Sequence, residues 1–317
     1  MSLAKIIASI ILVVSPAVTA STPQTLASNA PLAKQLPQPP IQLIKAYPSG
    51  AVVELNNAQA LMAEFNQENY QLESVINTRQ LPRYFVENLP PNLNDLPVQQ
   101  KISLFIRLLL PTIKAVNQQI LTVRSQVIEL EKKPKSQWSA AEQNWLQGLF
   151  DSYVVKSARI DDLLLQLDIV PSGMVLAQAI DESGWGSSYF AVAGNNLYGE
   201  HLSASGGEYL TTPGGHVKVA AFSNLYQSTA SYMHNLNTTL AYQELRLLRK
   251  QLRGQNKLNG DELVQALTHY STRGEAYVDN LRALIKRHRL DDFNEAKLTG
   301  TASIRYRFST PVKQSAQ

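Results

Sequence analysis

The longest regular pattern of apolar and polar positions begins near Val98. Apolar residues recur there in alternating steps of four and three, which is the spacing of a heptad stripe. The stripe consists of Ile102, Ile106, Leu109, Ile113, Val116, Ile120, Val123, Val127 and Leu130. It predicts one long amphipathic helix that packs its apolar side against other helices of the same chain and ends at Pro134.

Shorter patterns predict the elements that follow this helix. Residues Ser139 to Glu142 have the Ser-x-x-Glu form of a capping box, which opens a second helix. Pro171 suits the first turn of a further helix that is apolar on nearly every side and is therefore expected to be buried. Two short strands are predicted over 208–212 and 216–222, joined by a Pro-Gly-Gly turn. The predicted fold class is α+β, predominantly helical, with a small β-lobe.

The first residues have the features of an export signal. Lys5 precedes an apolar run, a helix-breaking Pro16 follows it, and Val18 and Ala20 suit cleavage after Ala20. The apolar run is shorter than the roughly 20 residues that a membrane-spanning helix needs. We therefore predict a signal peptide over 1–20, export from the cytoplasm, and no membrane span after removal of the signal.

Composition and charge narrow the chemistry. A formal net charge of +4 and a pI near 9.1 favour contact with anionic polymers, and export argues against a nucleic-acid partner. The absence of cysteine excludes disulfides and thiolate chemistry. The 5 histidines are scattered without metal-ligand spacing, so neither a metal nor a cofactor is predicted. The basic stretch over 246–257 is interpreted as a solvated helix face.

An acidic pair, Asp181 and Glu182, stands where the apolar helix ends, directly before Ser-Gly-Trp-Gly. Glu182 meets the negative end of the helix dipole and apolar neighbours there, and both effects raise the pKa of a carboxyl group. A carboxyl that stays protonated can act as a general acid at a glycosidic oxygen, as a glutamic acid beside a tryptophan does in lysozyme, a different protein. Trp185 could serve that purpose here. The alternative is that the pair merely ends a helix near solvent.

The stretch LAQAIDESGWGSSYFAVAGNNLYG, over 176–199, closely resembles the signature of glycoside hydrolase family 73, the endo-β-N-acetylglucosaminidase domain. The stretches over 99–124, 219–249 and 267–285 are similar to the Bax-type subgroup found in Gram-negative bacteria. The resemblance implies a lysozyme-like catalytic domain, a peptidoglycan substrate, and a periplasmic or cell-envelope location.

The domain organisation follows from these patterns. After the signal peptide, a linker with an irregular or helical N-terminal region is expected over 21–95, and the helical region with the heptad stripe over 96–150. The lysozyme-like glucosaminidase domain is expected over 151–292, and a polar, irregular tail over 293–317.

The resemblance also implies roles for individual residues. Glu182 matches the catalytic acid, Trp185 the aromatic residue beside it, and Tyr270 a tyrosine that faces the cleft. Tyr198 and Gly199 complete the Asn-Leu-aromatic-Gly segment and are expected to contact substrate. Asn196 is expected to bind sugar acetamido groups, and the alternative is that its side chain holds the turn that enters this segment.

The second catalytic group is left open by the sequence. The resemblance implies a candidate, because some members of that family carry a glutamate in the β-lobe. Glu208, just before the first predicted strand, is the nearest counterpart and the first candidate for a base, and Glu200 is the second. If neither acts, the acetamido group of the substrate could assist, and one carboxyl would then be sufficient.

The predicted function is hydrolysis of β-1,4 bonds in peptidoglycan on the reducing side of N-acetylglucosamine, with Glu182 as general acid. Two alternatives stay open. The first is a muramidase or lytic transglycosylase, and the second is a non-catalytic domain that binds glycan strands as a scaffold.

Overall fold

The computed structural model describes residues 35–45, 47–203, 206–212, 215 and 217–309 of the 317-residue chain. The predicted signal peptide over 1–20 and His216 lie outside the described residues. From Leu36 onward the described residues form one unit.

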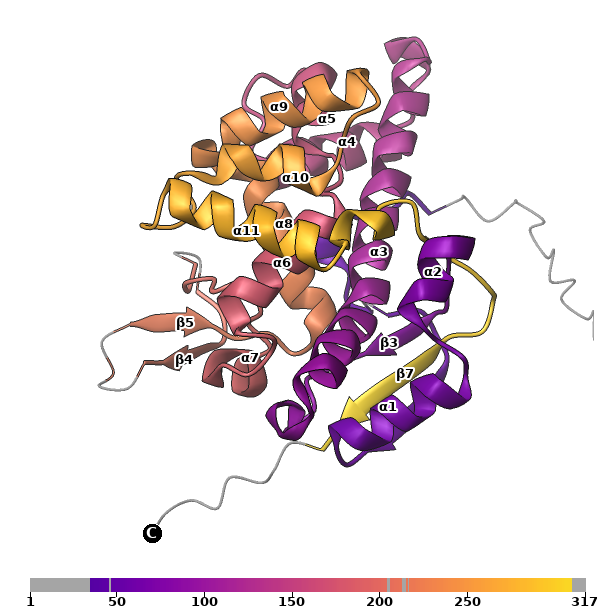
Figure 1. Cartoon of the computed structure of the whole chain (residues 1–317). Helices are drawn as coiled ribbons and strands as arrows, with labels where there is room; N and C mark the ends of the chain where they lie inside the picture. The colour runs from indigo at the N-terminus through magenta and orange to yellow at the C-terminus, as the bar shows by residue number, and fades with distance from the viewer. Residues whose placement is uncertain (1–34, 46, 204–205, 213–214, 216, 310–317) are drawn as a thin grey trace, which may run out of the picture. The chain divides into compact units, whose positions relative to one another are not determined.

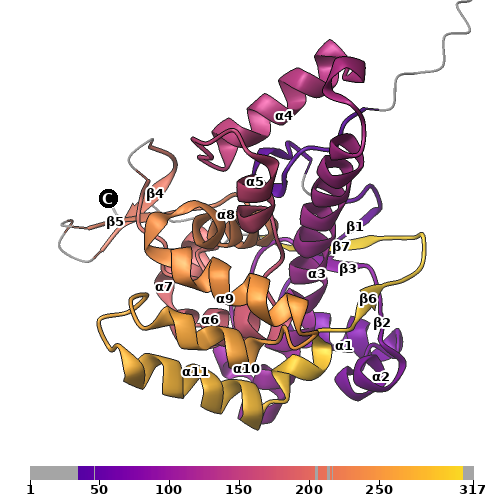
Figure 2. The ribbon, with the colours of Figure 1, turned by 90° about the horizontal axis from the view of Figure 1, so that it is seen from above.

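The heptad stripe forms α3 (Val98–Glu131), a helix of 34 residues. Every stripe residue from Ile106 to Leu130 is buried, as predicted. Figure 1 shows why, because α3 runs between two groups of elements, one formed by α1, α2, β3 and β7 and the other by α6 and α8 to α11. The turned view in Figure 2 shows the same arrangement. The long helix is therefore the shared core of both groups.

The remaining elements are short helices and very short strands. Before α3 lie β1 (Ala51–Leu55), α1 (Ala58–Gln67), α2 (Leu72–Thr78), β2 (Gln80–Leu81) and β3 (Tyr84–Val86). After α3 lie α4 (Ala140–Ser152), α5 (Ile160–Gln166), α6 (Ser172–Ser183), α7 (Tyr189–Gly194), β4 (Tyr209–Thr211), β5 (Lys218–Ala220), α8 (Leu225–Thr238), α9 (Gln243–Gly254), α10 (Gly260–Leu263), α11 (Glu275–Arg287), β6 (Lys297–Leu298) and β7 (Ile304–Phe308). Short 3-10 helices are η1 (Pro40–Gln42), η2 (Leu93–Asp95), η3 (Lys135–Gln137), η4 (Leu240–Tyr242), η5 (Val264–Leu267) and η6 (Leu290–Phe293).

These elements confirm the predominantly helical α+β class. The predicted capping box is present at α4, where the Ser139 hydroxyl accepts from the Glu142 amide at 3.2 Å and the Glu142 carboxylate accepts from the Ser139 amide at 2.9 Å. The predicted hairpin is also present, because β4 pairs antiparallel with β5. In Figure 1 the hairpin extends beside α7, away from the stacked helices.

The chain's C-terminal segment corrects the prediction of a polar, irregular tail over 293–317, because its described part contains two strands. β7 is the central strand of a parallel sheet with the order β1-β7-β3. Tyr306 and Phe308 point into the core, and Arg305 and Arg307 alternate with them and bind the Glu87 carboxylate. In this half-buried strand, polar and buried residues alternate. The two arginines at the polar positions led to the prediction of a polar tail.

The basic stretch in α9 also differs from its prediction as a solvated face. Arg246 and Arg249 are buried. The Arg249 guanidinium donates to the carbonyls of Leu165 and Asp168 at 2.9 and 3.1 Å, near the end of α5. Because the last carbonyls of a helix lack partners within the helix, a buried arginine there replaces water as their donor.

Helix α6 is the element that positions the acidic pair. It packs against α3, α10, α11 and η6, and all of its residues from Ser172 to Ile180 are buried. Only its C-terminal end reaches the surface. Asp181 and Glu182 therefore emerge from a rigid core helix, which fixes where their carboxyl groups lie.

Candidate active site

A cleft of about 590 Å³ opens at the C-terminal end of α6, between the loop that follows α7 and helix α8. It is lined by Glu182, Tyr198, Gly199, Glu200, His201, Ser203, Ser231, His234, Asn235, Thr238, Thr239, Tyr242, Tyr270 and Ser271. Of the predicted site residues, Glu182, Tyr198, Gly199 and Tyr270 thus meet in one place.

The end of α6 turns the chain sharply beside this cleft. Gly184 takes the left-handed conformation (φ 57°), and its N–H donates to the carbonyl of Ile180 and closes the helix. Trp185 is also left-handed (φ 60°), which is uncommon for a bulky residue. Ser183 is buried and its hydroxyl donates to the carbonyl of Ala179, so it stabilises the helix end.

The two carboxyl groups of the acidic pair have different surroundings. Asp181 forms an ion pair with Arg273 and accepts from Asn280 Nδ2 at 2.6 Å, which ties the end of α6 to α11. Glu182 points into the cleft, where burial raises its pKa and the negative charge of Asp181 adds to the effect. Hydrogen bonding from Tyr277 and the charge of Arg273 oppose this rise. The net result is a carboxyl group that holds its proton more tightly than a solvated one.

A chain of buried polar groups leads to Glu182. The Tyr232 hydroxyl donates to Gln178 Oε1, and Gln178 Nε2 donates to the Tyr277 hydroxyl at 2.9 Å. All three side chains are buried. The Tyr277 hydroxyl accepts from Gln178 and keeps its own proton, and its interaction with the Glu182 carboxyl lowers the pKa of Glu182. Sequence reasoning missed this chain, although Gln178, a polar residue one turn before Glu182 in an apolar helix, was an available signal.

Gly199 lies directly against the acid. It has φ 68°, and a Cβ at this position would be 3.2 Å from Glu182 Oε2. The neighbouring Tyr198 is buried, its ring stacks on Tyr232 at 4.0 Å between centroids, and its carbonyl accepts from the Tyr270 hydroxyl at 2.9 Å. Tyr198 is thus mainly a core residue. Tyr270, in the segment before α11, is hydrogen-bonded to the loop that carries Gly199.

Two residues predicted to bind substrate do not line the described cleft. The Trp185 ring contacts Phe105 and His288 edge-on, with centroids 5.9 and 5.0 Å away. Asn196 is buried, and its side chain is bonded to the backbone of Glu200 at both its oxygen and its nitrogen, at 3.0 and 2.8 Å. The structure therefore places Asn196 as the alternative described it, holding the turn.

The two candidates for a second catalytic carboxyl group, Glu208 and Glu200, lie in different surroundings. Glu208 is exposed just before β4 and is not among the residues that line the cleft, so its position does not favour it as the base. Glu200 does line the cleft. Its Oε2 accepts from the Ser231 hydroxyl at 3.0 Å, and its Oε1 is buried with no partner among the described residues. Burial raises the pKa of Glu200 to about 8.

In the part of the chain that the structure describes, no group of three or more His, Cys, Asp or Glu side chains is placed to hold a metal ion. No helix of this part is both long and apolar enough to span a membrane.

A helical α+β fold with a half-buried acid of raised pKa in an open cleft is compatible with a glycoside hydrolase. Residues 158–290 match the family described as mannosyl-glycoprotein endo-beta-N-acetylglucosaminidase, or glucosaminidase. The chain is 34% identical over 187 residues to Protein bax of Escherichia coli (strain K12), which covers 57% of this chain and 67% of that protein. The solved catalytic domain of the autolysin Auto from Listeria monocytogenes is 16% identical with a TM-score of 0.31, over 54% of this chain and 96% of that one.

The chain belongs to the glucosaminidase family, glycoside hydrolase family 73, in its Bax-type subgroup. The protein is therefore a glycoside hydrolase, as predicted. Membership of this family also bears out the predicted lysozyme-like class of its catalytic domain.

Proposed function

We propose that the protein hydrolyses the glycan strands of peptidoglycan at β-1,4 bonds on the reducing side of N-acetylglucosamine, with Glu182 as the general acid. The observation that carries this proposal is the position of Glu182, in the cleft with its pKa raised by burial. A protonated carboxyl there can donate to the leaving glycosidic oxygen as the C1–O bond breaks. Family membership supports the substrate class.

The cleft favours assistance by the substrate over a second carboxylate. Burial raises the pKa of Glu200 to about 8, so this carboxyl is mainly protonated at neutral pH, which disfavours it as a base. In the proposed mechanism, the carbonyl oxygen of the substrate's own 2-acetamido group attacks C1 while Glu182 protonates the leaving oxygen. The Glu182 carboxylate then takes a proton from the water that opens the cyclic intermediate. The product should keep the β configuration at C1.

The cellular location is a second part of the proposal. The features of residues 1–20 support export, and a peptidoglycan substrate is reached in the periplasm or cell envelope of a Gram-negative bacterium. A fusion of residues 1–30 to a reporter enzyme that is active only outside the cytoplasm tests it. An inactive reporter would contradict the proposed location.

Mass spectrometry of the soluble fragments from purified sacculi tests the bond that is cut. After chemical reduction of these fragments, reduced N-acetylglucosamine ends are expected. Reduced N-acetylmuramic ends would identify a muramidase, and anhydro-muramic ends a lytic transglycosylase. No fragments, together with retention of the protein on sacculi, would identify a binding scaffold. Proton NMR of the fresh product should show the β anomer first, and an initial α anomer would contradict assistance by the acetamido group.

The role of Glu182 is tested by Glu182→Gln, which should lower the rate of sacculus solubilisation at least about 100-fold. Glu244→Gln is the matched control, because it makes the same change at an exposed position on α9 outside the described cleft lining. It should keep nearly full activity. Equal activity of Glu182→Gln and the wild type would show that Glu182 is not the general acid.

A further inference from the structure

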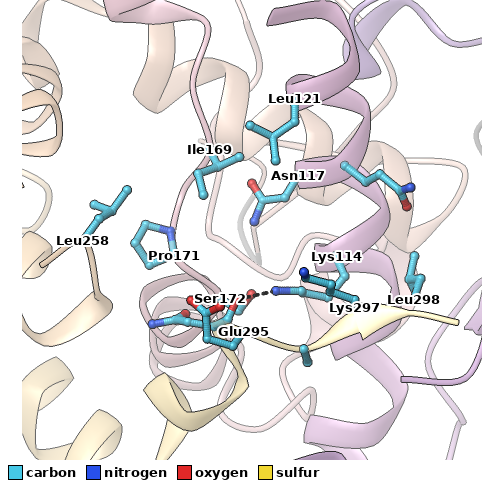
Figure 3. A pocket seen from close by; sticks show the side chains of 13 residues that line it. Lys114, Asn117, Leu121, Ile169, Pro171, Ser172, Leu258, Glu295, Lys297 and Leu298 are labelled. Carbon is cyan, nitrogen blue, oxygen red and sulfur yellow. Dashed lines mark hydrogen bonds between the residues drawn. The ribbon is translucent and has the colours of Figure 1, made fainter. Parts of the chain in front are cut away.

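A second cavity, of about 440 Å³, lies at the N-terminal end of α6, and none of the residues that line it lines the active-site cleft. Its walls come from α3, from the segment that enters α6 and from the segment that enters β6, and Figure 3 shows their side chains converging on it. This volume is within the range of cavities that hold small ligands.

Unused hydrogen-bond donors remain at this cavity on Lys114, which is half-buried, and on Ser172, which is buried. Lys114 Nζ donates to the carbonyls of residues 293 and 294 at 3.4 and 2.8 Å, which leaves one of its three N–H groups. Ser172 is 1% exposed, and its hydroxyl has no partner among the described residues. Asn117, by contrast, uses both ends of its amide on the backbone of Val170. A ligand that completes this site needs an acceptor group.

The charges around the cavity favour an acceptor that is negative. The exposed Lys297 also lines it, and neither this lysine nor Lys114 forms an ion pair with any described residue. Burial lowers the pKa of Lys114 to about 8; the charge of Lys297 adds to this effect and the exposed Glu295 opposes it. The lining thus carries two ammonium groups against one carboxylate, and an anion would compensate the excess.

Apart from Gln118 and Asn294, the rest of the lining is apolar. Ile169, Leu258 and Leu298 are half-buried against the core, and Leu121 leaves 39% of its surface exposed. An apolar group of a ligand would remove these side chains from water, at about 25 cal/mol for each Å² covered.

We propose that this cavity binds a small carboxylate that carries a short apolar group. The carboxylate accepts from Lys114 and Ser172, and Lys297 contributes its charge. The apolar group lies against Leu121 and Ile169. This site is independent of the proposed hydrolysis, because its ligand makes no contact with the cleft residues.

Isothermal titration calorimetry on the full mature chain at pH 7 and low salt tests the site. Two acids represent the two possible sources of the ligand: hexanoate for a free alkyl acid and N-acetyl-D-alanyl-D-alanine for the end of a wall peptide. Hexanamide is the uncharged control. Binding of either acid, at least about tenfold tighter than the amide, supports the proposal, and the tighter acid indicates the source. No binding of either acid, or equal binding of the amide, overturns it.

Three variants locate the bound acid. Lys114→Met should weaken binding at least about tenfold. Ser172→Ala loses no described hydrogen bond, so it should keep or raise the melting temperature and still weaken binding several-fold. Lys250→Met, an exposed lysine on α9, is the matched control and should bind as the wild type does. Wild-type affinity in both Lys114→Met and Ser172→Ala would overturn the assignment, as would an equal loss in Lys250→Met.

Discussion

The Tyr277 hydroxyl is the group through which the protein interior adjusts the acid, and Tyr277→Phe removes it alone. The side chain is buried, so the ring keeps its place while the oxygen is lost. The hydroxyl lowers the pKa of Glu182, in opposition to burial. Without it, burial and the charge of Asp181 act with less opposition, and the pKa of Glu182 should rise further.

The size of this effect follows from the contact that is lost. A hydrogen bond to a charged group contributes about 1.5–3 kcal/mol. The lower end applies here, because Glu182 is partly exposed and solvent screens its charge. Since one pKa unit corresponds to about 1.4 kcal/mol, the expected change is about one unit. The acid stays protonated to higher pH, so the alkaline limb of the kcat/KM profile should move upward by about one pH unit.

The assay is the initial loss of turbidity of a dilute peptidoglycan suspension between pH 4 and 10. Tyr70→Phe is the matched control, because it removes a buried hydroxyl that donates to the carbonyl of Arg107 at 2.9 Å, outside the described cleft lining. Its alkaline limb should coincide with that of the wild type. An unmoved limb in Tyr277→Phe, or one moved to lower pH, would refute the role assigned to this hydroxyl.

Three further changes test the site and the fold. Gly199→Ala puts a Cβ 3.2 Å from Glu182 Oε2 and a side chain on a left-handed backbone, so it should lower activity at least about tenfold and stability by about 1 kcal/mol; full activity would contradict this close approach. Glu200 has a folded pKa of about 8 against an ordinary value of 4.5, so the unfolded state binds fewer protons between these values and stability falls as pH rises through them. Glu200→Gln should therefore raise the melting temperature more at pH 8 than at pH 5, and an equal change at both would contradict a protonated Glu200. Tyr306→Ala should destabilise the fold by about 3–5 kcal/mol in urea unfolding, whereas a tail residue would change it by less than about 0.5 kcal/mol.

The parts of the fold that depend on local pattern were predictable. The stripe of α3 and the capping box of α4 each need only neighbours within a few turns of chain. The sheet was not predictable, because β7 pairs with strands more than 200 residues earlier in the chain. Its polar positions are explained by Glu87 and Glu54, partners that no local pattern indicates.

The candidate site likewise contains residues that local sequence indicated and residues whose roles depend on distant contacts. Glu182 was recognisable from the end of a buried helix and from its motif. Asn196 was not distinguishable by sequence from a sugar-binding amide, because its role depends on the backbone groups that the fold brings to it. Tyr277 was missed because its contact with Glu182 crosses from α11 to α6, and Glu200 was ranked second because burial by α8 is invisible in the sequence.

The acidic pair shows how two adjacent carboxyl groups come to serve different purposes. Successive residues of a helix point about 100° apart, so Asp181 reaches Arg273 at the start of α11 while Glu182 turns into the cleft. The same short segment of α11 supplies Tyr277, whose ring lies under the Arg273 guanidinium at 4.6 Å. Both groups that lower the pKa of Glu182 thus come from one segment at the start of α11, and they oppose the rise that burial causes. The proton affinity of the acid is therefore a balance between burial, which is the largest cause, and two opposing groups from one segment, and Tyr277→Phe removes one of these groups while burial stays in place.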